Sequence, residues 1–181
     1  MNTNNWQPLT PHTQNLIPQE LHSWLIDTGS LTAKLRNLCN SFSVHLLQQR
    51  ERKAFPHEST LLELADNKQL IDREVQLYCD EIPVVYARSL IPVRAISDRF
   101  KDLDNMGERP LGEKIFSDPQ LNRSPIEWCA MNSENPNFGN ACRNVTRTPA
   151  RLYGRRSLFY GAAKPIMISE FFLPGIMDIC S

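Results

Sequence analysis

The sequence has no excess of either charge, because twenty Lys and Arg residues balance twenty Asp and Glu residues in a chain of 181 residues. A protein that binds nucleic acid or an anionic membrane through its general surface usually carries a clear basic excess. The composition supports neither function, and we expect no nucleic-acid partner. A site for an anionic ligand therefore has to be built locally from a few basic side chains.

The chain also lacks the hydrophobic segments that direct proteins into or across membranes. No apolar run is long enough to span a bilayer. The polar, proline-containing segment 1–18 lacks the basic and then apolar layout of a signal peptide. We therefore expect a cytoplasmic protein without membrane insertion. One domain is expected at this length, with residues 1–17 as a flexible segment and residues 18–181 as the domain.

Cysteine is sparse and follows no motif. The five cysteines form no CxxC pair and have no histidine at ligand spacing, which argues against structural zinc. Cys129 and Cys142 flank a loop and could pair under oxidation, although a reducing compartment disfavours this. The sequence also has no nucleophile elbow, phosphate loop or metal-ligand cluster. We expect neither a metal nor an organic cofactor.

Two short helices are predicted ahead of the main body of the domain. Pro18 suits the first turn of a helix and Gly29 suits its end, so a helix is expected between them. Ser30 has the side chain of an N-cap for a second helix that carries Leu31 and Leu35. The domain is therefore expected to begin with two helices.

Strand patterns dominate the rest of the chain. Residues of alternating polarity begin at Phe42, and two pairs of strand-like segments come after it, each joined by a short turn. The predicted hairpins are 69–78 with 83–91 and 152–160 with 165–173. Residues 97–103 predict a short helix, and 106–150 predict mostly loop around short ordered pieces. The sequence therefore predicts an α+β fold, a single domain in which an antiparallel sheet has helices packed on one side.

Two charged side chains lie on strand faces that are otherwise apolar. Arg73 shares its face with Val75 and Leu77, and Glu170 follows Ile168 on one face of the last strand. A buried guanidinium is costly unless it meets a carboxylate, which it can bind bidentately. A buried carboxylate is a candidate acid, base or polar anchor. The alternative is that Arg73 and Glu170 form a structural ion pair or reach the sheet edge. The strand pattern alone does not distinguish this structural role from a functional one.

Other basic residues are weaker candidates for an anion site. Arg88 raises the same question in the neighbouring strand, and there a structural role is favoured. Arg155, Arg156 and Lys164 lie near the last hairpin and could attract an anionic ligand, although such clusters are usually solvated.

Several short motifs occur in a fixed order between residues 24 and 174. The strongest are Gly154-Arg155-Arg156-Ser157, and Lys164-Pro165 followed by Ser169-Glu170-Phe171-Phe172-Leu173-Pro174. The others are Trp24-Leu25, Gly29-Ser30-Leu31-Thr32, Arg73-Glu74-Val75, Ala87-Arg88, Ile91-Pro92-Val93, Pro110-Leu111-Gly112 and Ile115-Phe116. No single motif is diagnostic, but the ordered set resembles the chorismate pyruvate-lyase family of the ubiquinone pathway.

The resemblance implies a fold and a set of site residues. The family fold is a six-stranded antiparallel sheet with helices, and flap-like loops cover an internal ligand site. By resemblance, Arg73 binds the ring carboxylate of chorismate and Glu170 meets the ring hydroxyl, and these two are the catalytic pair. Leu31 and Leu111 occupy two further substrate-binding positions. The candidate partners of the pyruvyl carboxylate are Arg88, Arg155 and Lys164. An apparent insertion at residues 117–151, which includes Cys129 and Cys142, departs from the family pattern and affects the expected flaps and product release.

The activity implied by the resemblance is elimination of pyruvate from chorismate to give 4-hydroxybenzoate, the first committed step toward ubiquinone. Aromatisation drives the reaction, so no cofactor is expected, and a monomer is expected because no long apolar edge stands out. Two alternatives are a non-catalytic effector-sensing domain of the same fold, and a lyase for another enolpyruvyl compound. The sensor is disfavoured because such regulators carry a DNA-binding domain first, and only about twenty residues precede the first predicted helix.

Overall fold

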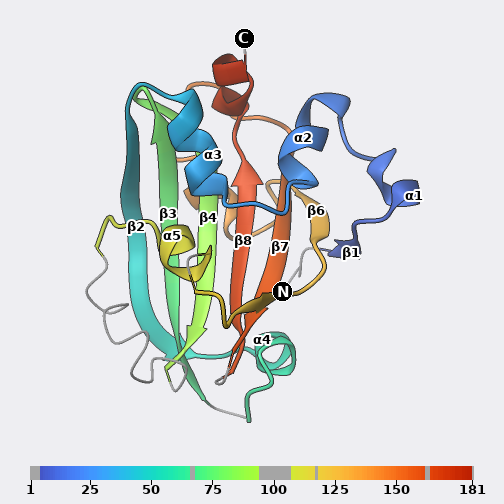
Figure 1. The fold of residues 1–181 in the computed structure, drawn as a ribbon, viewed down its shortest axis with the longest axis vertical. Helices are drawn as coiled ribbons and strands as arrows, with labels where there is room; N and C mark the ends of the chain where they lie inside the picture. The colour runs from blue at the N-terminus through green and yellow to red at the C-terminus, as the bar shows by residue number, and fades with distance from the viewer. Residues whose placement is uncertain (1–4, 66–67, 94–106, 117, 162–163, 181) are drawn as a thin grey trace.

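In the part of the chain that the structure describes, six strands of five residues or more form one antiparallel sheet (Figure 1). The computed structural model describes residues 5–65, 68–93, 107–116, 118–161 and 164–180. The six strands are β2 (Phe42–Lys53), β3 (Gln69–Cys79), β4 (Ile82–Pro92), β6 (Glu127–Met131), β7 (Leu152–Tyr160) and β8 (Ile166–Phe172). Two-residue strands β1 (Gln7–Pro8) and β5 (Asn122–Arg123) pair with β6 and β7, and the strand order is β1-β6-β7-β8-β4-β3-β2. The predicted fold class is confirmed.

Both predicted hairpins are present in the sheet. β3 and β4 are joined by Asp80 and Glu81, whose φ angles of 47° and 68° are those of a tight turn that matches the twist of the strands. The Asp80 carboxylate accepts a hydrogen bond from the Ser41 backbone N–H at 2.7 Å, which ties the turn to the start of β2. β7 pairs with β8 as predicted. β8 also pairs with β4, so the second hairpin closes against the first.

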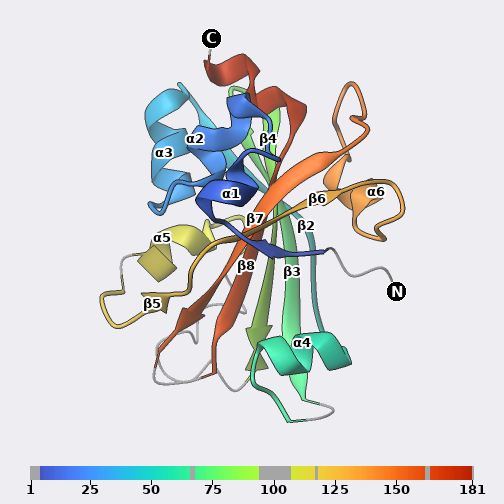
Figure 2. The same cartoon turned by 90° about the vertical axis from the view of Figure 1, so that its right-hand side faces the viewer.

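The helices that cover one face of the sheet are α2 (His22–Leu25), α3 (Leu31–Leu38) and α5 (Leu111–Phe116), which lie together on one side in Figure 2. The short helix α1 (Pro11–Gln14) has no buried residue and lies beyond the β6 edge of the sheet (Figure 1). Ser30 caps α3 as predicted, since its Oγ accepts a hydrogen bond from the Ala33 N–H. The helix expected between Pro18 and Gly29 is shorter than predicted, a 3-10 turn η1 (Gln19–Leu21) that leads into α2. No helix in the described ranges is both long and apolar enough to cross a membrane.

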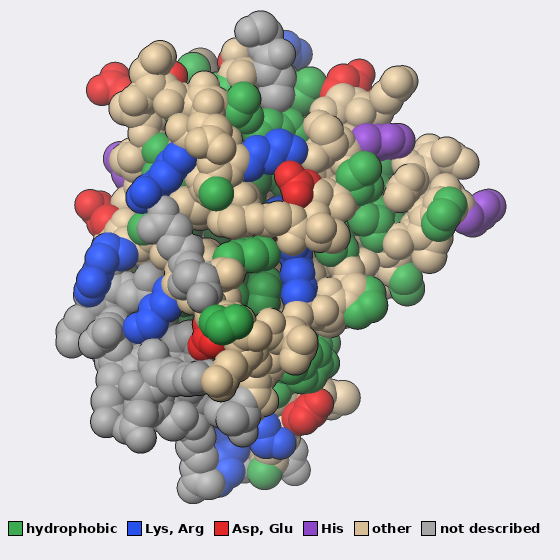
Figure 3. All heavy atoms as spheres, in the orientation of Figure 1, with side chains coloured by type: hydrophobic (Ala, Val, Ile, Leu, Met, Phe, Trp, Pro, Cys, Tyr) green, Lys and Arg blue, Asp and Glu red, His purple; other side chains and the backbone are tan. Residues whose placement is uncertain are grey.

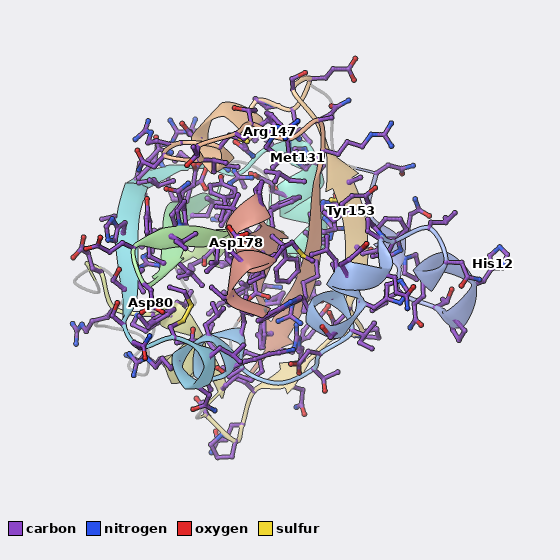
Figure 4. All side chains as sticks on the ribbon, turned by 90° about the horizontal axis from the view of Figure 1, so that it is seen from above. His12, Asp80, Met131, Arg147, Tyr153 and Asp178 are labelled. Carbon is purple, nitrogen blue, oxygen red and sulfur yellow. A yellow bond between two sulfur atoms is a disulfide. The ribbon has the colours of Figure 1, made fainter. Side chains whose placement is uncertain are left out.

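The segment 106–150, predicted as mostly loop, contains α5 and a strand of the sheet, and its last part covers the other face. β6 lies within this segment, and the short helix α6 (Phe138–Ala141) comes next on the face opposite α3 (Figure 2). Viewed from above, Met131 and Arg147 lie on that opposite side (Figure 4). The buried amide of Gln76 donates to the Ala141 carbonyl at 3.0 Å, which fixes this segment to β3. The predicted helix at 97–103 lies outside the described residues.

The remaining elements lie at the ends of the sheet and the chain. They are α4 (Pro56–Leu61) and the 3-10 turns η4 (Pro174–Ile176) and η5 (Asp178–Cys180). Trp6 packs against Phe171 with 5.7 Å between ring centroids, so the first described residues contact the sheet through this ring as well as through β1.

The cysteine pairing offered by the sequence is wrong. Cys129 and Cys142 are free, whereas Cys39 and Cys79 form a disulfide with Cα atoms 5.3 Å apart. Cys39 directly follows α3 and Cys79 ends β3, so the packing of helix on sheet brings them together. Cys39 and Cys79 are 40 residues apart in the sequence, so their spacing did not indicate that they would meet.

Gly154 in β7 provides a test of the packing within the sheet. A Cβ added at Gly154 would clash with the ring of Phe171, its partner in β8. We predict that Gly154→Ala lowers the free energy of unfolding by roughly 1–3 kcal/mol through overpacking. Gly139→Ala is the control, since nothing lies within 4 Å of its added Cβ. Urea denaturation of both variants checks this, and equal stabilities would contradict the packing.

Candidate active site

A pocket lies between the sheet and helices α3 and α5. Its empty space, including the opening to solvent, is about 580 Å³. All four residues predicted to contact a ligand line it, and they are Leu31, Arg73, Leu111 and Glu170. Figure 3 shows this face of the molecule, where Lys and Arg side chains border hydrophobic ones near its centre.

The register of the sheet explains how distant residues meet in the pocket. Two adjacent rows of side chains cross the sheet on the pocket face. Arg73, Ser89, Ile168 and Ser157 form one row, and Val75, Ala87, Glu170 and Arg155 form the other. Arg73 and Glu170 are thus two strands and one row apart, on the order of 10 Å between their backbones. They face the same space without forming a pair.

Arg73 is a buried cation that no described carboxylate neutralises. Arg73 is only 2% exposed. Its Nη2 donates hydrogen bonds to the backbone carbonyls of Gly107 at 2.9 Å and Arg109 at 3.0 Å. Its Nε is buried without a hydrogen-bond partner in the described part of the chain. Burial lowers the pKa of Arg73 to about 10, so the side chain stays charged at neutral pH. A buried charge with an unused donor is typical of a site that binds an anion.

Glu170 is held at the pocket wall by Arg155. Arg155 Nε donates to Glu170 Oε2 at 2.6 Å, and Arg155 Nη1 donates to the backbone carbonyls of Trp24, at 2.7 Å, and Asp27. Arg155 is 1% exposed, and these partners engage its Nε and Nη1. The sequence offered Arg155 as a partner for a ligand carboxylate, but the structure places it as the support of Glu170.

A second arginine, which the sequence patterns did not reveal, lines the pocket. Arg123 Nε donates to Ser157 Oγ and its Nη1 donates to the Thr28 carbonyl, both at 2.9 Å. Its guanidinium lies 5.5 Å and 5.6 Å from the ring centroids of Phe116 and Phe159. Burial, together with the charge of Arg155, lowers the pKa of Arg123. Arg123 belongs to a two-residue strand, which is too short for alternation of polarity to reveal a face.

Two other basic candidates do not reach the pocket. Arg88 lies on the opposite face of the sheet, where it binds both oxygens of Asp72 at 2.8 and 2.9 Å and contacts Glu58 at 3.4 Å. Burial alone raises the pKa of Asp72, but hydrogen bonds and charge from Arg88 and Arg52 outweigh it, and the net pKa is lowered. The structural role favoured for Arg88 fits this network. Lys164 contacts Glu63 at 3.8 Å and both side chains are about half exposed.

The polar groups that line the pocket suit an organic acid. They are two arginines, one carboxylate, and the hydroxyls of Ser89 and Thr32, which are 4% and 5% exposed as residues. Leu31 and Leu111 are the first residues of α3 and α5, where backbone N–H groups lack partners within the helix. In the described ranges, no group of three or more His, Cys, Asp or Glu side chains could hold a metal ion.

Comparison with known proteins agrees with this geometry. A family model described as chorismate lyase matches residues 1–180. The chain belongs to the chorismate lyase family. Probable chorismate pyruvate-lyases are similar to it over most of their length, with 36% identity in Aromatoleum aromaticum and 40% in Pseudoalteromonas translucida. The first alignment covers 90% of this chain and 89% of the relative, and the second covers 84% and 83%.

This chorismate lyase family member is also similar to domains of transcriptional regulators. The effector domain of PhnF from Mycobacterium smegmatis has a TM-score of 0.57 at 12% identity, covering 82% of this chain and 90% of that domain. The ligand-binding domain of a putative GntR-family regulator from Bordetella bronchiseptica has a TM-score of 0.56 at 15% identity, covering 75% and 86%. At these identities the likeness is one of fold alone.

Replacing an arginine with methionine should affect the stability of the protein differently on the two faces of the sheet. Arg73→Met removes a buried charge that lacks a carboxylate, so we expect the free energy of unfolding to change by less than about 1 kcal/mol, or to rise. Arg88→Met leaves Asp72 with less compensation and should cost roughly 2–4 kcal/mol. Chemical denaturation measures both. A larger loss for Arg73→Met than for Arg88→Met would show that Arg73 is structural.

Proposed function

We propose that the protein is a cytoplasmic, monomeric lyase that converts chorismate into 4-hydroxybenzoate and pyruvate on the way to ubiquinone. The observation that carries this proposal is the position of two side chains at separate places in one pocket. One is Arg73, a buried arginine that no described carboxylate neutralises, and the other is Glu170, a carboxylate held by Arg155. Arg73 suits a carboxylate and Glu170 suits a hydroxyl, and chorismate presents these two groups at opposite ends of its ring.

The ring carboxylate of chorismate binds Arg73 in this proposal. The Nε donor of Arg73, which has no hydrogen-bond partner among the described residues, supplies a hydrogen bond to this carboxylate. Ser89 is the cross-strand partner of Arg73, and its hydroxyl is available on the same side. The apolar residues between the two ends, such as Val75 and Ile168, exclude water from the ring and strengthen both polar contacts.

Glu170 accepts the hydrogen bond of the ring hydroxyl. Arg155 engages Oε2 of Glu170, which leaves Oε1 for the substrate. In the reaction, the ring carbon that bears the hydroxyl loses its hydrogen as a proton, and that electron pair forms the new ring double bond. The adjacent C–O bond of the ether breaks, and the departing enolpyruvate takes up a proton to become pyruvate. The protein orients the ring and stabilises the charge that develops on the ether oxygen.

The proposal is tested by mixing chelator-treated protein with chorismate and measuring 4-hydroxybenzoate and pyruvate by chromatography. Equimolar release is the expected result. Binding of chorismate without conversion would favour the sensor alternative, for which the likeness to regulator domains is the supporting observation. Absence of both binding and conversion would favour another enolpyruvyl substrate.

Variants of the two polar ends should affect different kinetic constants. Arg73→Ala is expected to raise KM for chorismate roughly tenfold or more, because a hydrogen-bonded charge pair is lost. Glu170→Gln keeps the size of the side chain and is expected to lower kcat roughly tenfold to a hundredfold. Lys164→Ala, outside the pocket, is the control and should match the wild type. Steady-state assays check this, and wild-type kinetics in Arg73→Ala or Glu170→Gln would remove that residue from the site.

The lowered pKa of Arg73 predicts how anion binding depends on pH. Only the protonated guanidinium attracts a carboxylate, so affinity for benzoate should be constant near neutral pH and fall as pH rises above about 10. Benzoate is the probe because it has no phenol to titrate. Calorimetric titrations at several pH values measure this, with circular dichroism as a check of folding. An affinity that stays level to about pH 11 would contradict the assignment.

A further inference from the structure

We propose that Arg123 forms a second carboxylate subsite, which binds the enolpyruvyl carboxylate of the substrate and has nothing to bind in the ring product. This inference rests on the proposed function and deepens it. It assigns a role to a residue for which neither the motifs nor the family resemblance gave one.

The balance of charge requires a second cation in the pocket. A substrate with two carboxylates needs two cations in a pocket that excludes water. Arg73 serves the ring carboxylate, and Arg155 is bound to Glu170 and to backbone carbonyls. Arg88 and Lys164 do not line the pocket. Arg123 is thus the remaining described arginine that lines it.

Arg123 also has spare binding capacity. Its protein partners are neutral oxygens, the Ser157 hydroxyl and the Thr28 carbonyl, which engage Nε and Nη1. The charges of Glu170 and Asp27 attract Arg123, but each carboxylate is bound to another cation. Glu170 is bound to Arg155, and Asp27 is bound to Lys34 at 3.1 Å. Nη2 has no hydrogen-bond partner within the described ranges. A guanidinium held on one side and free on the other is suited to a carboxylate.

The position of Arg123 matches the shape of chorismate. Ser157, which holds Arg123, ends the row that begins with Arg73, and Glu170 lies in the adjacent row one strand before it. In chorismate the ether oxygen is bonded to the ring carbon next to the one bearing the hydroxyl. With the ring carboxylate on Arg73 and the hydroxyl on Glu170, the enolpyruvyl group therefore lies at the Glu170 end of the pocket. That end is where Arg123 lies.

The surroundings of Arg123 also place it nearer the opening than Arg73. Arg123 itself is of intermediate exposure and Phe116 beside it is 36% exposed, whereas Arg73 is only 2% exposed. The leaving enolpyruvate thus departs from the outer part of the pocket while the ring is still bound deeper. A cation at this position lowers the energy of the negative charge that forms as the C–O bond breaks.

The test separates substrate from product, since only the substrate has the second carboxylate. Arg123→Gln is expected to raise KM for chorismate roughly tenfold to a hundredfold, with less than about a twofold change in Kd for 4-hydroxybenzoate. Arg123→Lys keeps the charge and should recover part of the loss. Arg73→Met is the matched control and should weaken both ligands. Steady-state kinetics and calorimetric titration supply the two constants.

A second variant keeps the proposal testable if Arg123→Gln does not fold. Ser157→Ala removes the hydroxyl that positions Arg123, and should raise KM for chorismate about two- to fivefold without changing Kd for 4-hydroxybenzoate. Equal weakening of both ligands in the folded variants would overturn the subsite, since Arg123 would then only shape the pocket. An unchanged KM would overturn it too. If the wild type binds chorismate without converting it, the lyase proposal fails, and Kd values for chorismate and 4-hydroxybenzoate still decide the subsite.

Discussion

The bond between Arg155 and Glu170 connects the parts of the molecule that enclose the pocket. Arg155 extends from β7, holds the carboxylate of Glu170 on β8, and donates to the carbonyls of Trp24 in α2 and of Asp27 in the segment between α2 and α3. The same guanidinium therefore orients the acidic group of the site and fixes the chain that leads into α3, which lines the pocket with Leu31. Because Arg155 is almost fully buried, these contacts are strengthened by the low dielectric around them.

The arginines on the two faces of the sheet differ in how their charge is compensated. Arg88 lies in a network with Asp72, Glu58 and Arg52, in which each charge has an opposite partner. Arg73 lies one position from Asp72 in sequence but on the other face, where it meets backbone carbonyls and no described carboxylate. One face therefore stabilises the fold, and the other keeps an uncompensated charge that an anionic ligand can satisfy.

The same fold occurs in regulators that sense ligands, so the fold alone does not decide between catalysis and sensing. What favours the lyase is the chemistry of this pocket, a carboxylate and two arginines placed around an apolar space, together with the relatives named as probable lyases. The segment 132–151 covers the face of the sheet away from the pocket, where Gln76 anchors it. The later part of the apparent insertion thus lies on the far face, whereas its earlier part brings Arg123 into the pocket.

The fold class, both hairpins, the cap at Ser30 and the face on which Arg73 lies could all be predicted from the sequence. These features depend on local periodicity and on side chains that act within a few residues of their own backbone. The sequence could also place Glu170 on a strand, but it could not show whether Arg73 or Arg155 binds it. That choice depends on strand order and register, which are set by contacts between residues far apart in the chain. For the same reason, three-dimensional packing was needed to show that Cys39 meets Cys79, that Arg88 faces away from the pocket, and that Arg123 lies within it.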